Sequence, residues 1–333
     1  MKSLMFAALM VSVGCGDNHT KKPVDAMPDA QDPVERGQYI MNVTGACTFC
    51  HTPLNMDGSR DLTRLFAGVN CLFDVDTDPT NGVGCLSSRN LTPDPTGLAN
   101  ATDEQIKDAF RNGHRTDGKT LTPVMPYWAF HNMTDDDADA VVAYLRSLPP
   151  VNHTLPPNEE PWLDINNSGP VSPYIDPATQ IPLPTTGETD THAMHGRYLA
   201  SEAGLCIDCH TPAAPNMGLF PPIDLTKPFQ GGRQFPKEEL GLLDPSYPAI
   251  INSRNLTPDA TGLMGYSITD IENAIAKGKD PMGNAVCAAT HGSQISPYAA
   301  LEQGDLDDIA AYVAALPPAA NDTSPNCAGP PVP

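Results

Sequence analysis

The chain has 333 residues, 40% of them hydrophobic, and a formal net charge of −21 at neutral pH. This length is enough for two small domains, each with its own core. A surface this acidic repels the phosphate backbone, which excludes nucleic acid as a partner. It favours a basic or charge-matched protein partner that is reached by electrostatic steering; the alternative is that the acidic surface serves only to keep the protein soluble.

The first 32 residues predict export rather than a folded unit. Residues 1–14 are expected to be a signal peptide, because Lys2 is followed by an apolar run, Leu4–Gly14, that is too short to span a bilayer. Gly14-Cys15 resembles a bacterial lipoprotein cleavage site, so Cys15 is a candidate for lipidation; an ordinary signal peptide is the alternative. The acidic residues 15–32 are expected to form a flexible tether. The sequence therefore predicts a periplasmic protein that meets the membrane only through a lipid anchor.

The pentad Cys47–His51 (C-T-F-C-H) is the most informative segment of a first predicted domain, residues 33–150. Two thiols three residues apart on a helical turn point the same way, so both can bond one porphyrin. The adjacent His51 can then reach the iron as its proximal ligand, as in a c-type haem site. A single pentad would also be compatible with a redox CxxC motif or half a zinc site.

Two helices are predicted downstream of this pentad. Residues 102–105 (T-D-E-Q) form a capping box, and the helix that they begin is expected to end at Gly113. The last helix of the domain begins at Thr134, has three aspartates at its positive end and runs to Ser147.

Residues 151–189 are predicted to link this domain to a second one. Ten prolines lie between Pro149 and Pro184, but Trp162 and Tyr174 make the segment too apolar for a free tether. We expect the linker to be ordered and to wrap across the domain surfaces.

Residues 190–333 repeat the pattern of the first domain. The pentad Cys206–His210 (C-I-D-C-H) lies 159 residues after the first, and both pentads continue Thr-Pro. The segment S-R-N-L-T-P-D occurs at 88–94 and again at 253–259. A helix beginning with a capping box at Thr269 and a last helix at 305–316 complete the match. A second pentad inside a repeat argues against a chance CxxC motif.

The chain resembles a di-haem class I cytochrome c. It is similar to the cytochrome c modules of quinoprotein alcohol dehydrogenase cytochrome subunits, in which N-L-T-P-D and M-P-Y segments both occur. The resemblance implies an all-α fold of two tandem class I cytochrome c-like haem domains. It also implies two haem c groups, bound covalently by four cysteines and ligated by two proximal histidines: Cys47, Cys50, Cys206, Cys209, His51 and His210.

The resemblance extends to residues around the haems. The carbonyls of Pro53 and Pro212 correspond to the family's acceptors for the N–H of the proximal histidine. Arg89 and Arg254 occupy matched places in the N-L-T-P-D segments, where each is either a partner for a haem propionate or an ordinary surface arginine.

The sixth ligands are expected to differ between the two haems. In the first domain, Met125 occupies the axial position of the M-P-Y segment; Met133 is the second candidate, and His114 and His131 are expected at the surface. In the second domain the corresponding residue is Ser296, whose hydroxyl is a poor ligand for haem iron.

The ligand loop of the second domain is also longer, and it contains His291. We expect His291 to be the sixth ligand of the second haem. Met282 and an open position are the alternatives. A histidine ligand would give this haem a lower potential than a methionine ligand gives the first.

Four cysteines remain after haem attachment and lipidation are assigned. Cys71 and Cys85 bracket a Gly- and Asp-rich excursion in the first domain, and Cys287 and Cys327 lie in a loop and after the last helix of the second. An exported protein can form disulfides. We therefore expect the pairs Cys71–Cys85 and Cys287–Cys327.

These features predict an electron-transfer protein rather than an enzyme. Two haem c groups would pass electrons from a dehydrogenase or quinol-linked donor to an oxidase or another cytochrome. The alternative is a di-haem peroxidase-like enzyme with an open second haem, in which His291 would act as a distal acid or base. A subunit docked permanently on a dehydrogenase is a third interpretation.

Overall fold

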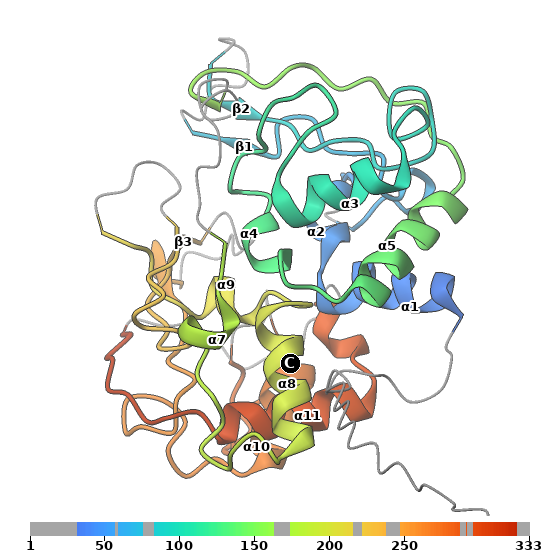
Figure 1. The fold of residues 1–333 in the computed structure, drawn as a ribbon. Helices are drawn as coiled ribbons and strands as arrows, with labels where there is room; N and C mark the ends of the chain where they lie inside the picture. The colour runs from blue at the N-terminus through green and yellow to red at the C-terminus, as the bar shows by residue number, and fades with distance from the viewer. Residues whose placement is uncertain are drawn as a thin grey trace, which may run out of the picture.

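The computed structural model describes residues 32–56, 59–75, 83–162, 174–215, 222–237, 247–286, 291 and 296–324. The predicted signal peptide, Cys15, the tether and the Cys287–Cys327 pair lie outside these ranges. Figure 1 shows two halves, residues 33–150 above and 190–324 below. Among the described residues, no helix is long and apolar enough to cross a membrane.

The first half is built mainly of helices around one core. Its elements, in chain order, are α1 (Pro33–Tyr39), a π-helical turn (Ile40–Thr44), α2 (Cys47–His51), a 3₁₀ turn (Leu62–Arg64), β1 (Phe73–Asp74), β2 (Cys85–Leu86), α3 (Asp103–Asn112), α4 (Tyr127–Phe130) and α5 (Asp135–Ser147).

The second half repeats the main elements in the same order. They are α8 (Thr191–Ser201), α9 (Cys206–Cys209), β3 (Gln234–Pro236), β4 (Ile250–Asn252), α10 (Ile268–Lys277), a 3₁₀ turn (Pro297–Ala300) and α11 (Gln303–Ala314). The short helix α7 (Pro177–Gln180) lies in the segment that joins the two halves. Both strand pairs are antiparallel. The fold is therefore mostly helical rather than all-α, because the loop after each pentad folds back and pairs with itself.

The first and last helices of each half cross at a glycine, and Figure 1 shows α1 against α5 and α8 against α11. A Cβ atom on Gly37 would overlap the carbonyl of Ala140, and one on Gly196 would overlap that of Asp308. Only a residue without a side chain lets these backbones approach so closely. The repeated Gly-x-Tyr pattern therefore fixes the same helix crossing twice.

The N-L-T-P-D segments form a second repeated feature. Nδ2 of Asn90 donates to the Val151 carbonyl at 2.9 Å, and Nδ2 of Asn255 donates to the Ala319 carbonyl at 2.8 Å. Both asparagines are buried. Each one ties the chain that leaves the last helix back to the loop that covers the proximal histidine.

The helix ends test the capping predictions. Thr102 caps α3, which ends at Gly113 in a left-handed conformation, as predicted. In α10, however, the cap is Ser267, because its hydroxyl and N–H bond reciprocally with Asp270. Thr269 was the wrong choice, since Ser267 forms the same box two residues earlier. The last helix, α11, begins at Gln303 and not at 305, and its N-cap residue Glu302 makes no side-chain capping hydrogen bond.

The two halves exchange equivalent hydrogen bonds. The Tyr39 hydroxyl accepts from the N–H of Glu302, and the Tyr198 hydroxyl accepts from the N–H of Thr134, at 3.1 and 3.2 Å. Glu302 and Thr134 each precede the last helix of the opposite half. This reciprocity gives the contact an approximate two-fold symmetry.

Candidate haem sites

The two pentads lie on the short helices α2 and α9, and their cysteines are free thiols. Burial raises the pKa of Cys47 and Cys209 to about 12 and that of Cys50 and Cys206 to about 11. Zinc binding and thiol–disulfide exchange need a thiolate. The four thiols are half-buried and neutral in this structure, which is compatible with covalent attachment of a porphyrin, because a thioether carries no charge.

Each proximal histidine is oriented by a backbone carbonyl. Nδ1 of His51 lies 2.8 Å from the Arg89 carbonyl, and Nδ1 of His210 lies 2.8 Å from the Arg254 carbonyl. A carbonyl can only accept, so Nδ1 carries the proton and the lone pair of Nε2 is free for a metal. Burial lowers the pKa of both histidines, which favours this neutral form.

The prediction that the carbonyls of Pro53 and Pro212 accept from the N–H groups of the proximal histidines is therefore wrong. These carbonyls accept from the N–H groups of Asp61 and Asp224 instead, at 2.8 and 2.7 Å. The chain folds back after each pentad, and this closes a turn on the proline carbonyl. The N-L-T-P-D loop then supplies the acceptor for the histidine.

The arginines whose carbonyls fulfil this role have side chains with other surroundings. Within the described ranges, neither the Arg89 nor the Arg254 guanidinium has a carboxylate within 4 Å. The Arg254 guanidinium lies 5.6 Å from the centre of the Tyr266 ring. Both cations are thus available to an anionic group, and their pairing with propionates stays a prediction.

Both candidate methionines of the first half contact its core. Met125 is half-buried and packs against the core cluster that also contacts Cys47. Met133 is 2% exposed and belongs to that cluster, so the choice of Met125 as sixth ligand stays a prediction. His114 is exposed and pairs with Asp108.

His131 is not the free surface side chain expected from the sequence. It is half-buried, and its ring stacks on Tyr174 with the ring centres 3.9 Å apart. The chain after the linker's central part packs onto it, which the local sequence around His131 could not indicate.

The distal side of the second half brings His291 opposite His210. Their ring centres lie 6.1 Å apart, and Nδ1 of His291 is buried without a hydrogen-bond partner among the described residues. Two imidazoles bound to opposite sides of one metal, with bonds of about 2 Å, would have ring centres about 6 Å apart. Burial, and then His210, lowers the pKa of His291 to about 4, which keeps it neutral. These residues therefore fit an iron between two imidazoles.

Met282, the alternative ligand, lies on a turn and is 85% exposed. A side chain in this position is solvated, whereas haem ligands are shielded from solvent. The geometry therefore favours His291 over Met282.

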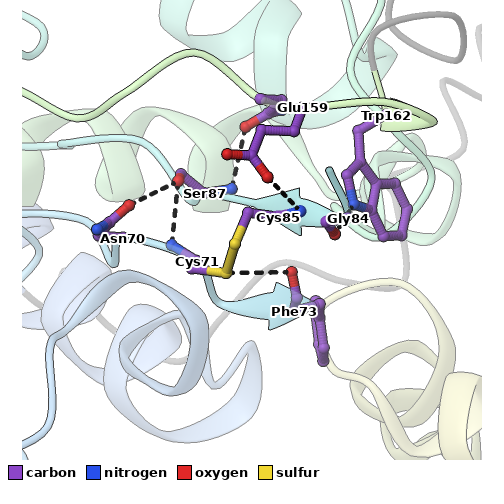
Figure 2. The surroundings of a disulfide bond; sticks show 9 residues. Asn70, Cys71, Phe73, Gly84, Cys85, Ser87, Glu159 and Trp162 are labelled. Atoms are coloured by element: carbon purple, nitrogen blue, oxygen red, sulfur yellow. Dashed lines mark hydrogen bonds between the residues drawn. A yellow bond between two sulfur atoms is a disulfide. The ribbon is translucent and has the colours of Figure 1, made fainter. Parts of the chain in front are cut away.

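Figure 2 shows the disulfide between Cys71 and Cys85, which was expected from the sequence. It joins the start of the β1–β2 hairpin to its end. The N–H of Cys85 donates to Glu159 at 3.0 Å, and the Trp162 indole donates to the Gly84 carbonyl at 2.6 Å. The hairpin thus holds the first part of the segment 151–189 against the first half.

Residues 34–149 match the family model described as Cytochrome c. The first half is a cytochrome c domain. A domain of this family carries covalently bound haem c, which agrees with the residues around His51. The repeated features of the second half place a similar set of residues around His210.

The chain is similar to three relatives over regions longer than this cytochrome c domain. The chain is 28% identical over 309 residues to the cytochrome c subunit of alcohol dehydrogenase (quinone) from Gluconacetobacter polyoxogenes, covering 87% of the chain and 58% of the relative. It is 30% identical to the fructose dehydrogenase cytochrome subunit from Gluconobacter japonicus, covering 62% and 41%. It is 24% identical to a diheme cytochrome c-type protein from Cereibacter sphaeroides, covering 62% and 67%. The chain thus spans little more than half of the alcohol dehydrogenase subunit.

Sequence reasoning missed the carbonyls of Arg89 and Arg254 and the hydroxyls of Tyr39 and Tyr198. Both sets recur at matched places in the two halves. Their repetition was a signal of a shared structural role, but it did not indicate which atom is used.

Proposed function

We propose that this protein transfers electrons through two haem c groups between a dehydrogenase and a further electron acceptor, an oxidase or another cytochrome. The observation that carries this proposal is the pair of pentads, each with its proximal histidine held in the same tautomer. Haem supplies the one-electron chemistry, while the protein sets potential and access. The relatives, which are dehydrogenase cytochrome subunits, support a dehydrogenase as donor. Export to the periplasm and a lipid on Cys15 remain part of this proposal.

The two attachment helices lie close together, which supports transfer between the two sites. Burial is the main cause of the raised pKa of Cys209, and the neighbouring Cys50 thiol raises it further. Asp208 likewise raises the pKa of Cys50. The packing agrees with this proximity, since Leu205, which directly precedes the second pentad, packs against the core cluster of the first half that Cys47 also contacts.

Unequal distal residues support a directional pair. Met125 is proposed as sixth ligand of the first haem and His291 as sixth ligand of the second. A thioether raises the potential of a haem relative to an imidazole. Electrons would therefore favour the first haem.

A haem count with a redox titration tests the proposal. We expect two haem c groups per chain, both low-spin, with two separate potentials, and reduction by a dehydrogenase purified from the same membranes. One haem per chain, or no reduction by any such dehydrogenase, would refute it.

The peroxidase-like alternative requires an exchangeable position on the second haem. The placement of His291 opposite His210 argues against this. High-spin haem and turnover of peroxide would restore the alternative.

A further inference from the structure

The second half has a groove beside its pentad that is covered by the chain's own linker. Ile181 is 3% exposed and belongs to the same cluster as Ile207 and Tyr312. The Pro182 carbonyl accepts from Nε of Arg197 at 3.1 Å and from the Tyr312 hydroxyl at 3.0 Å. An extended segment is thus bound there through one apolar side chain and its backbone carbonyls.

The first half has the corresponding groove, with a volume of about 470 Å³. The repeat relates its lining residues to those that bind the linker: Gln38 to Arg197, Thr48 to Ile207, Leu62 to Leu225 and Tyr144 to Tyr312. Its described lining comes from the first half, except for Ser296 and Pro297, which precede α11 in the second half. Leu62 is 73% exposed and Phe49 is 46% exposed.

The charge of this groove differs from that of the whole molecule. The chain carries a net charge of −21, yet the described lining of the groove includes Arg60 and no carboxylate. The Arg60 guanidinium lies 4.8 Å from the centre of the Phe49 ring. The groove therefore offers an apolar floor, hydroxyl and amide groups, and one cation.

We propose that this groove binds an extended segment of the electron-transfer partner, the dehydrogenase of the proposed function, on which this inference rests. An apolar side chain of the segment packs on Phe49 and Leu62, its carbonyls meet Tyr144 and Gln38, and a carboxylate pairs with Arg60. In the second half, residues 177–182 of the linker already occupy the corresponding groove.

The position of the groove makes this docking relevant to electron transfer. Thr48 and Phe49 line it and stand between the two haem-bonding cysteines of the first pentad. A partner bound there lies directly beside the first attachment site. Next to the second pentad, Ile181 of the linker packs in the cluster that contains the fully buried Ile207, so the partner engages the first half.

A synthetic peptide with the sequence of residues 174–185 serves as the probe, because its parent segment occupies the related groove. Fluorescence anisotropy of the labelled peptide with the full haem-loaded chain should show saturable binding. Leu62→Glu should weaken binding at least tenfold. Leu54→Glu is the matched control, since Leu54 is 53% exposed but does not line the groove, and it should leave binding unchanged. No saturable binding, or equal binding by Leu62→Glu with an unaltered haem spectrum, would overturn the proposal.

The second measurement concerns the partner. Saturating peptide should slow reduction of the protein by the dehydrogenase at least fivefold; an unchanged rate would overturn the docking site and leave the proposed function intact. Failure of every dehydrogenase to reduce the protein would refute the proposed function, whereas the peptide-binding measurement would still show whether the groove binds an extended segment.

Conversion of a dimer to a monomer by Leu62→Glu would assign the groove to a second copy. Stronger peptide binding after removal of residues 16–31 would assign it to the N-terminal segment, and either result would overturn the proposal.

Discussion

A single hydrogen bond decides what each proximal histidine can do. Because the carbonyls of Arg89 and Arg254 fix the proton on Nδ1, Nε2 of His51 and His210 is left as a metal ligand. His291 shows the opposite condition, since its buried Nδ1 has no partner among the described residues. A buried polar atom without a partner is costly, which a metal bond would relieve.

His291→Ala should remove the sixth ligand of one haem. We expect half of the low-spin absorption to become high-spin, while the other haem is unchanged. Met282→Ala is the control and should leave the spectrum as it is. An unaltered spectrum in His291→Ala would exclude His291 as a ligand.

Among the described residues, the most deeply buried ion pair joins α1 to α5. Nε and Nη2 of Arg36 donate to both oxygens of Asp137 at 2.8 and 3.0 Å, and both residues are under 9% exposed. Removing one partner of such a pair leaves an uncompensated charge and costs about 3–5 kcal/mol. We therefore expect Arg36→Met to lower the free energy of unfolding by about that amount in denaturant titrations.

The control for this change is Arg64→Met. Its partner is Asp61, and the Arg64 side chain is 43% exposed. The loss should stay below about 1 kcal/mol, as for other exposed pairs. A similar cost in both variants would contradict the argument from burial.

At the scale of elements, the helix crossings depend on two glycines. A methyl group at position 37 or 196 would meet backbone atoms of α5 or α11, which cannot rotate away. Gly37→Ala and Gly196→Ala should each cost at least about 1–3 kcal/mol, the range for overpacking.

Gly304 in α11 provides the matched test, because an added Cβ there meets nothing within 4 Å. Gly304→Ala should leave stability unchanged or raise it by up to about 1 kcal/mol through helix propensity. Thermal unfolding followed by far-UV circular dichroism would measure all three variants. Equal effects would show that the crossings are not tightly packed.

The N-L-T-P-D turns carry an acid-sensitive element. The hydroxyl and N–H of Thr96 hold the pKa of Asp94 below its ordinary 3.8, and Thr261 does the same for Asp259. A lowered pKa in the folded state adds stability above pH 3.8, and this is lost as the pH falls through the folded value. The double variant Asp94→Asn, Asp259→Asn should therefore lose less stability than the wild type between pH 5 and pH 2, about the range in which carboxylates are protonated. Parallel acid profiles would refute this.

At the scale of the whole molecule, the contact between the halves is reciprocal but unequal. Tyr39 and Tyr198 each accept from the start of the opposite last helix, and within the described ranges the Tyr198 hydroxyl also donates to the buried Asp137 carboxylate at 2.7 Å. Asp305 stands near the Tyr39 hydroxyl and, after burial, helps to raise its pKa. Burial raises the pKa of both tyrosines, so both hydroxyls keep their protons. The contact can therefore be tested by removing one hydroxyl at a time.

Tyr198→Phe should cost about 1.5–3 kcal/mol, because a hydrogen bond to a charged group is lost. Tyr39→Phe should cost about 0.5–1.5 kcal/mol, the range for a neutral bond. Chemical denaturation of both variants would measure the difference. A larger cost for Tyr39→Phe would contradict this assignment.

The sequence by itself determined the local chemistry of this protein. The spacing within the pentads fixes which side chains share a helical turn, the repeats fix matched roles, and the caps at Thr102 and Thr134 fix two helix starts, since all of these depend on residues a few positions apart. The tertiary structure alone decided which carbonyl meets each proximal histidine, that His291 comes opposite His210, and that Ile181 fills one groove while its counterpart is lined by exposed Leu62. These contacts join residues that are 38, 44 and 81 positions apart for the histidines and 26 apart for Ile181 and Ile207. Their partners are selected by packing and by the satisfaction of buried polar groups rather than by local propensity.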